Sequence, residues 1–314
     1  QFNGGKIAVT KFYTDVEGSM YLGTNYSLFR YTASTGRIEL LPNTDKDKVM
    51  NHIIESRVVS VIRDTINGNP VLLTSPYGHF LAYYDLEERK WVSRLDSSSN
   101  IVSRFGIRDN LIRKFFRSAD GNVWLANVKD GLGHWGDPSS AKLTYYKNNP
   151  NDSLSLSNNH VYDMTDDNKG NLWVSTYGGG LQHFNIRERK FRHISASGNL
   201  LEGVQTDAKG NVWMIGGGNL QRYDIAAGTF SSFELPDINK SGGVTGYLYK
   251  DDEGNLYAAG PGYIIHFQPA GIANEWQQPE VIFTGFRIFN DSYSNLLFDK
   301  KIRLRYTQNY FTIE

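Results

Sequence analysis

Apolar and polar residues alternate with a period of two in many short runs, a pattern typical of half-buried β-strands. Between residues 160 and 194 lie four such runs, HVYDMTD, NLWVST, GLQHFNI and KFRHI, separated by Gly-rich or charged turns. Named A to D in chain order, these four runs in about 40 residues predict one antiparallel sheet.

The same unit recurs along the chain. Its A–B turn glycine appears six times, at Gly18, Gly68, Gly121, Gly170, Gly210 and Gly254, so the spacings are 50, 53, 49, 40 and 44 residues. This period matches a four-stranded propeller blade. The sequence therefore predicts an all-β fold, a β-propeller with six visible repeats over residues 1–270. It leaves open whether six blades close the ring or a seventh completes the intact domain.

Two side chains of the repeat have structural explanations. Asp at the start of the A–B turn can accept backbone N–H groups, and it stands at Asp15, Asp167, Asp207 and Asp251; the third repeat has Ser118 instead. An aromatic ring follows the turn glycine by three residues at Tyr21, Trp124, Trp173, Trp213 and Tyr257, with Val71 in the second repeat. We expect these rings to pack neighbouring sheets together.

The pattern changes after Pro269. The sixth repeat shows three strands but no obvious fourth, and PEVIFTGFRIFN and KIRLRYTQNYFTIE follow with a different period. We therefore expect residues 271–314 to form a linker and the first strands of an Ig-like β-sandwich.

Charge and composition narrow the classes of partner. The chain has 33 basic and 33 acidic residues and no cysteine, so we expect no nucleic-acid contact, no disulfides and no thiol chemistry. The densest basic segment, Arg104 to Arg117, is expected to be solvated or internally paired. No apolar run is long enough to cross a bilayer, so membrane contact is expected only through segments outside this chain.

No constellation for catalysis, metal or cofactor emerges. The seven histidines are dispersed, and the Asp-rich turns lack the later Glu of a calcium loop. The GGG runs at 178–180 and 216–218 precede neither Lys-Ser/Thr nor a helix, so a phosphate loop is not expected. We expect no catalytic residue, metal site or cofactor.

Recognition chemistry concentrates in the B–C turns, which share one face with the long D–A linkers. A loop Tyr offers a flat apolar face to a sugar ring and a hydroxyl to its polar edge, while amides and charges supply hydrogen bonds. The candidates are Asn25, Tyr26, Tyr77, His79, Asn127, Lys129, Asp130, Tyr177, Asn219 and Tyr263.

These residues point to a family. The unit D-x-x-G-N-L-W-x-x-T-x-x-G-G-L, preceded by NDSLSLSNNHVYDM, resembles the two-component regulator propeller repeat of bacterial hybrid two-component systems. The segments PEVIFTGFRIFN and IRLRYTQNYFTIE resemble the start of the Ig-like sandwich with recurring tyrosines that follows such propellers.

The resemblance implies a sensor region on the periplasmic side of the bacterial inner membrane. Such a region recognises oligosaccharides from glycan breakdown, works as a homodimer, and passes its signal to a histidine kinase outside this chain, so this fragment is not expected to be an enzyme. Two alternatives stay open: a structural, dimerising propeller that relays a signal without binding ligand, and a propeller glycosidase or lyase.

Overall fold

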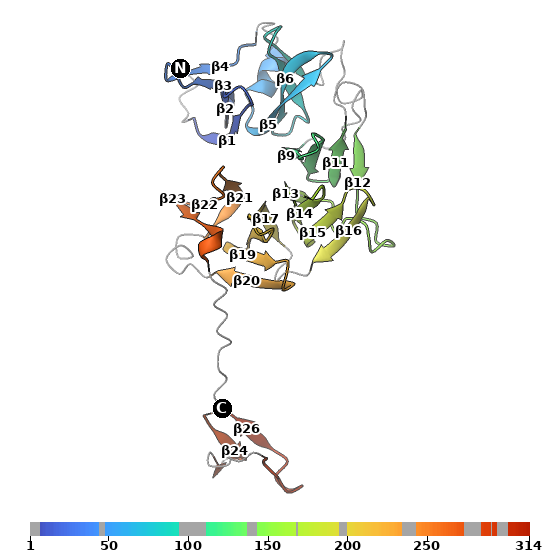
Figure 1. The fold of residues 1–314 in the computed structure, drawn as a ribbon, viewed down its shortest axis with the longest axis vertical. Helices are drawn as coiled ribbons and strands as arrows, with labels where there is room; N and C mark the ends of the chain where they lie inside the picture. The colour runs from blue at the N-terminus through green and yellow to red at the C-terminus, as the bar shows by residue number, and fades with distance from the viewer. Residues whose placement is uncertain are drawn as a thin grey trace. The chain divides into compact units, whose positions relative to one another are not determined.

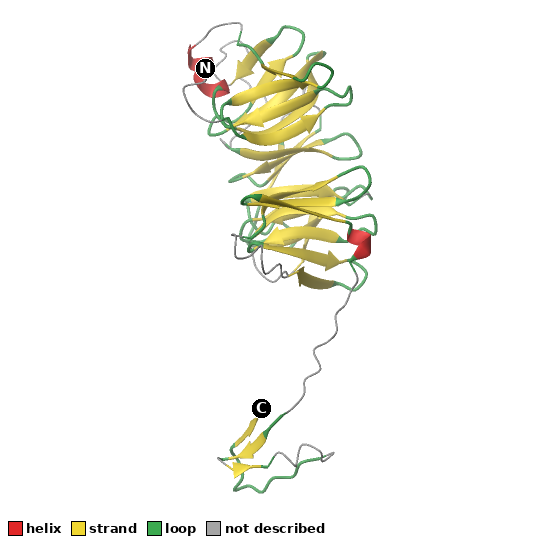
Figure 2. Ribbon diagram, turned by 90° about the vertical axis from the view of Figure 1, so that its left-hand side faces the viewer, coloured by secondary structure: helices red, strands yellow, loops and turns green. Residues whose placement is uncertain are grey.

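The computed structural model describes residues 7–43, 48–93, 111–136, 143–167, 169–194, 200–233, 243–272, 284–289, 291–293 and 301–314. The chain divides into two compact units, residues 1–270 and 271–314, and each is described by itself. Strands and turns dominate, and the helical elements of the described chain are α1 (Lys48–Ile54) and a 3-10 turn at Pro269–Gly271 (Figure 2).

Each of the first three sheets of unit 1 holds four antiparallel strands in sequence order. Blade 1 contains β1 (Val9–Thr14), β2 (Met20–Thr24), β3 (Ser27–Thr32) and β4 (Arg37–Leu40). Blade 2 contains β5 (Val58–Ile66), β6 (Asn69–Pro76), β7 (Ala82–Asp85) and β8 (Lys90–Ser93). Blade 3 contains β9 (Ile112–Arg117), β10 (Val123–Asn127), β11 (Leu132–Trp135) and β12 (Thr144–Tyr146).

The next three sheets continue the pattern. Blade 4 contains β13 (Val161–Asp166), β14 (Leu172–Thr176), β15 (Gly180–Asn185) and β16 (Lys190–Ile194). Blade 5 contains β17 (Leu201–Thr206), β18 (Val212–Gly216), β19 (Asn219–Asp224) and β20 (Thr229–Phe233). Blade 6 has three described strands, β21 (Thr245–Lys250), β22 (Leu256–Gly260) and β23 (Tyr263–Phe267).

The blades are arranged with their first strands toward a common centre. Successive first strands contact each other from β1 through β5, β9, β13 and β17 to β21, and Figure 1 shows the last strands on the outside. Blade 1 also approaches blade 6, because Lys11 Nζ on β1 lies 4.8 Å from the centre of the Tyr247 ring on β21. The predicted all-β propeller of four-stranded blades is confirmed.

The predicted A–B turns are confirmed as well. Asp207 Oδ1 accepts the N–H groups of Lys209 and Asn211, each at 2.9 Å, and Gly210 adopts a left-handed φ of 85°. Equivalent bonds form at the Asp residues of blades 1, 4 and 6. In blade 3, Ser118 takes one role of the missing Asp: it accepts the Trp124 indole N–H at 3.0 Å, as Asp207 Oδ2 accepts that of Trp213.

The recurring aromatic rings pack one blade on the next, as the sequence predicts. Trp124, Trp173 and Trp213 are at most 2% exposed. The Trp124 ring lies 5.7 Å from Phe184 of blade 4, and the Trp213 ring lies 4.9 Å from Phe267 of blade 6. Burying such a side chain contributes about 1.5–3 kcal/mol, so these contacts are a main source of cohesion between sheets.

Unit 2 contains one small antiparallel sheet. Strand β24 (Phe286–Ile288) pairs with β25 (Asp291–Ser292) on one side and with β26 (Phe311–Ile313) on the other. Phe286 and Ile288 are buried, whereas Phe311 and Ile313 are each 50% exposed. The Ig-like sandwich stays a prediction.

Candidate ligand-binding site

The candidates of blade 3 mostly build their own turn. Asn127 is 1% exposed, and its Nδ2 donates to the carbonyl oxygens of Leu125 at 3.3 Å and Gly131 at 3.0 Å. Asp130 forms an ion pair with Lys147, and Lys129 is exposed. Asn127, expected in the B–C turn, is therefore the buried last residue of β10 and offers no contact surface, whereas Lys129 remains accessible.

The candidates of blade 1 are engaged with nearby segments. Asn25 Oδ1 accepts the Ala8 N–H at 2.8 Å, which ties the turn to the start of β1. Burial, together with a hydrogen bond to Glu55, raises the pKa of Tyr26 above its usual value. Both side chains thus have structural contacts.

The candidates of blade 2 lie beside the helix that precedes it. Tyr77 is 57% exposed, and the His79 ring stands edge-on to His52 of α1 at 5.5 Å. Tyr77 is therefore accessible, whereas His79 is partly buried beside the helix.

The candidates of blades 5 and 6 contact backbone. Asn219 Nδ2 donates to Gly217 O at 3.4 Å, within its own turn. Tyr263 Oη donates to Gly243 O at 2.5 Å, which fixes the segment leading into β21. Neither joins the other candidates.

Tyr177 differs from the other candidates because its ring contacts Tyr162 on the first strand of its blade and His160 just before that strand. It is 42% exposed, its ring centre lies 5.3 Å from that of His160, and it stacks on Tyr162 at 6.4 Å. The sequence thus correctly places Tyr177 in a B–C turn, and the structure adds that this turn reaches the centre of unit 1.

We name the group of side chains around Tyr177 the central cluster. It contains Tyr177 itself, Lys11 of β1, Arg113 of β9, His160 just before β13, Tyr162 of β13, and Tyr247 of β21. Tyr162 is its hub, since its ring lies 5.7 Å from Tyr247 and 4.6 Å from Arg113 Cζ. Side chains of four blades meet here.

Arg113 is held from two directions. Its Nε–H donates to His160 Nε2 at 3.0 Å, which requires that nitrogen to carry no proton. The backbone oxygen of Arg113 accepts the Tyr247 hydroxyl at 3.2 Å. Burial in turn raises the pKa of Tyr247 well above its usual range, so its hydroxyl stays protonated and donates.

The carboxylates near the cluster already have partners. Asp163 is fully buried, and its Oδ1 receives the Lys114 ammonium and the Met164 N–H, while Oδ2 accepts the Val204 N–H at 3.0 Å. Glu202 Oε2 accepts the Gly246 N–H at 2.6 Å. Both anions serve to connect neighbouring blades.

Lys11 is partly buried and lies over the ring of Tyr247. Burial and the neighbouring Lys114 ammonium lower the pKa of Lys11 to about 8, and Asp163 opposes this only in part. The folded structure therefore disfavours the charged form of Lys11.

Sequence reasoning missed most of this cluster because Lys11, Tyr162 and Tyr247 lie on first strands rather than in turns. Arg113 belongs to the basic segment expected to be solvated or internally paired. Lys114 of that segment pairs with Asp163, and Arg117 pairs with Asp64 at 2.7 Å. Arg104 and Arg108 lie outside the described residues.

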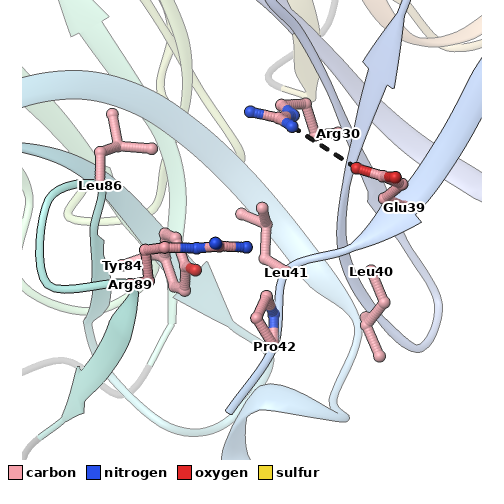
Figure 3. A pocket seen from close by; sticks show the side chains of 8 residues that line it. All are labelled: Arg30, Glu39, Leu40, Leu41, Pro42, Tyr84, Leu86 and Arg89. Atoms are coloured by element: carbon pink, nitrogen blue, oxygen red, sulfur yellow. Dashed lines mark hydrogen bonds and ion pairs between the residues drawn. The ribbon is translucent and has the colours of Figure 1, made fainter. Parts of the chain in front are cut away.

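A hollow lies between blades 1 and 2, away from the B–C turns. It has a volume of about 280 Å³, and Figure 3 shows Arg30 and Glu39 facing each other across from Tyr84 and Arg89. Arg30 Nη2 lies 3.5 Å from Glu39 Oε2, and both side chains are about half exposed. Arg30 and Glu39 of this hollow thus pair with each other, and its lining comes from two blades rather than from the four that meet in the central cluster.

The described part of the chain contains no cluster of three or more His, Asp or Glu placed to hold a metal ion. Within the described ranges, no helix has the length and apolar character needed to cross a membrane.

Comparison with known sequences points to the family that the repeat resembles. Residues 155–178 match the two-component regulator propeller family. Histidine kinase P4 of Formosa agariphila is 23% identical over 324 residues, a match that covers 95% of this chain but 22% of that protein. The chain therefore spans less than a quarter of this relative.

Solved structures share the fold. The extracellular domain of a proposed hybrid two-component system of B. thetaiotaomicron superposes with a TM-score of 0.64 at 16% identity, covering 85% of this chain and 34% of that one. The β-propeller domain of Swd1 from Myceliophteria thermophila gives 0.55 at 10% identity, covering 85% of each chain. The chain is thus a β-propeller that carries a two-component regulator propeller repeat and shares its fold with the extracellular domain of a proposed hybrid two-component system.

Proposed function

We propose that this chain is part of the extracytoplasmic sensor region of a hybrid two-component system and that it recognises oligosaccharides. The observation that supports this most is the central cluster, where a B–C turn tyrosine and first-strand side chains of four blades meet. Several rigid strands converging on one aromatic surface provide the preorganised platform that sugar recognition needs.

The similar proteins support the sensor assignment. The matched repeat belongs to two-component regulators, and the relatives include a histidine kinase and the extracellular domain of a proposed hybrid two-component system. In this proposal, the oligosaccharide binds on the periplasmic side of the inner membrane and changes the conformation of a homodimeric receptor. A histidine kinase outside this chain then starts the phosphorelay.

The aromatic surface supports sugar over most other ligands. The ring of Tyr177 is 42% exposed and is backed by Tyr162. A sugar ring carries C–H groups on one face, and these stack on an aromatic ring, while its hydroxyls pair with nearby polar groups. His160, 5.3 Å from Tyr177 between ring centres, supplies such a polar edge.

Calorimetry and thermal shift against a broad oligosaccharide panel test this proposal. A ligand that binds only the folded state stabilises it by RT ln(1 + [L]/Kd), about 2.7 kcal/mol at a hundred times Kd. Tyr177→Ala should abolish that shift. Tyr306→Ala is the matched control, because Tyr306 is 92% exposed and lies in unit 2. Absence of any stabilisation across the panel would count against oligosaccharide binding.

A structural, relaying propeller is the second candidate function. The observation that favours it is apolar surface at both ends of the series of blades: Phe12 of blade 1 is 64% exposed and Ile264 of blade 6 is 74% exposed. Such surfaces suit packing against further sheets. Light scattering of the chain tests it: self-association that Phe12→Ser abolishes favours this function, and a strict monomer opposes it.

A further inference from the structure

Two cations of the central cluster have no anionic partner within the described chain. Lys11 Nζ lies 4.8 Å from the centre of the Tyr247 ring, and Arg113 Cζ lies 4.6 Å from that of Tyr162. Neither forms an ion pair with a carboxylate of a described residue. A cation on an aromatic face gains some attraction, but less than one paired with an anion away from bulk water.

The nearby carboxylates cannot supply that anion. Asp163 is fully buried with both oxygens occupied by Lys114 and backbone N–H groups, and Glu202 is bonded to the Gly246 N–H. Pulling Asp163 toward Lys11 or Arg113 would leave the buried Val204 N–H without its acceptor, and pulling Glu202 away would do the same to the partly buried Gly246 N–H. Among the described residues, neither Asp163 nor Glu202 is therefore placed to neutralise the two cations.

We propose that Lys11 and Arg113 bind the negatively charged group of an acidic sugar, its carboxylate or its sulfate. This deepens the proposed oligosaccharide recognition and rests on it. The sugar ring stacks on Tyr177, and its anionic group reaches the two cations further into the cluster. The preferred ligand class is therefore anionic oligosaccharides rather than neutral ones.

The geometry of Arg113 fits this role. Its Nε–H is bonded to His160, its Cζ lies over the Tyr162 ring, and its two terminal nitrogens have no hydrogen bond to another described residue. A planar fork held in this way matches the two oxygens of a carboxylate or sulfate. Tyr247 couples the two cations, because its ring lies under Lys11 and its hydroxyl bonds the Arg113 carbonyl.

The lowered pKa of Lys11, about 8, agrees with this assignment. A like charge on Lys114 and removal from water disfavour the ammonium, so an incoming anion relieves an existing electrostatic cost. By contrast, Arg30 in the hollow of Figure 3 already faces Glu39. An anion entering that hollow would compete with the Glu39 carboxylate for Arg30, so we do not assign an anion site there.

The experiment is calorimetry of the chain with three matched probes: a neutral galactose oligomer, an oligogalacturonate of the same length, and a sulfated galactose oligomer. The acidic probes should bind at least about tenfold tighter than the neutral one, the effect expected of one charge-assisted contact. The stronger of the two acidic probes identifies the anionic group.

Variants locate the site. Lys11→Met and Arg113→Gln should each weaken acidic-probe binding by about tenfold or more and leave neutral-probe binding within about twofold. Lys209→Met is the matched control, because Lys209 is an exposed lysine in the A–B turn of blade 5, and this turn is not among the binding candidates. Lys11→Arg keeps the charge and should restore most of the binding, and far-UV circular dichroism verifies that every variant is folded.

The pH dependence gives a readout that a purely structural role would not produce. The groups facing Lys11 are Lys114, Asp163 and Tyr247, and Arg113 and Arg57 lie near Tyr247. Of these, Lys11 is the group expected to lose its charge near pH 8, so acidic-probe affinity should fall as pH rises from 7 to 9.5. Lys11→Met should abolish this dependence, while Arg113→Gln should retain it.

The outcomes separate this inference from the proposed function. Equal affinity for neutral and acidic probes overturns the inference and leaves oligosaccharide binding standing. Acidic-probe affinity unchanged in both Lys11→Met and Arg113→Gln also overturns it, because the anion would then bind elsewhere. No binding of any probe overturns the inference together with the proposed function.

Discussion

Blades 1 and 4 have the same strand order and pairing but different surroundings. Val9 and Val161 occupy matching positions in the first strands, and so do Phe12 and Met164. Val161 and Met164 are 0% exposed, whereas Val9 is 44% and Phe12 is 64% exposed. The difference lies in the neighbours: blade 3 packs on that face of blade 4, and no described sheet covers that face of blade 1.

The outer strands repeat the contrast. Phe191 of blade 4 is 2% exposed, and its counterpart Ile38 of blade 1 is 60% exposed. At the other end, Leu181 of blade 4 is fully buried against blade 5, while its counterpart Ile264 of blade 6 is 74% exposed. Strand formation within a blade therefore does not depend on burial of both faces, but cohesion between blades does.

The largest expected effect comes from removing an aromatic ring between blades. Trp213→Ala should destabilise unit 1 by about 3–5 kcal/mol, because Trp213 is fully buried between blades 5 and 6. Tyr257 of blade 6, the matching residue, is only partly buried, so Tyr257→Ala should cost clearly less. Urea unfolding monitored by circular dichroism measures both; equal losses would contradict the contrast between inner and end blades.

The next effect compares blades 1 and 4 directly. Met164→Ala should cost about 2–5 kcal/mol because it empties a buried site. Phe12→Ala should stay within about 0.5 kcal/mol, since the ring is already mostly in water. The same urea titration decides, and a large loss in Phe12→Ala would mean that another segment covers that face in solution.

A smaller effect is expected at the A–B turns. Asp207→Ala should cost about 1–3 kcal/mol, because it leaves the Trp213 indole N–H and two turn N–H groups without their acceptor. Ser118→Ala in blade 3 should cost less, since Asp120 still accepts the Asn122 N–H. Thermal unfolding followed by Trp fluorescence ranks the two; a reversed order would show that the Asp is not the main acceptor.

The smallest effect has the opposite sign. The folded pKa of Lys11, about 8, lies below its ordinary value of 10.5, so the charged side chain destabilises the fold at neutral pH. This cost is complete below pH 8, shrinks between pH 8 and 10.5, and vanishes above. Lys11→Met should therefore raise Tm slightly at pH 7, and the gain should disappear by about pH 10.5. A lowered Tm at pH 7 would indicate that the contact with Tyr247 dominates.

Much of the fold could be predicted from local pattern. Alternation with a period of two marked the strands, and the recurring Asp and Gly marked turns that the structure confirms at Asp207 and Gly210. The fully buried rings of Trp124 and Trp213 confirm the predicted packing between sheets. These features depend on residues a few positions apart, so the sequence displays them directly.

The candidate site was only partly predictable. Tyr177 could be chosen because it precedes three glycines in a B–C turn, yet Asn127, chosen by the same reasoning, is the buried last residue of β10. Polarity in a loop cannot distinguish a side chain that reaches a shared centre from one that bonds its own turn. That distinction depends on backbone direction, which the sequence pattern does not show.

By itself, the sequence determined the blade: its strands, its turns, and the rings that pack one sheet on the next. Only the tertiary structure decided which side chains meet at the centre. The Tyr247 hydroxyl donates to the Arg113 carbonyl across 134 residues of sequence. Lys11, near the other end of the unit 1 sequence, lies over the Tyr247 ring. Such contacts arise because successive sheets turn about a common centre, a property of all the blade interfaces together and of no single segment.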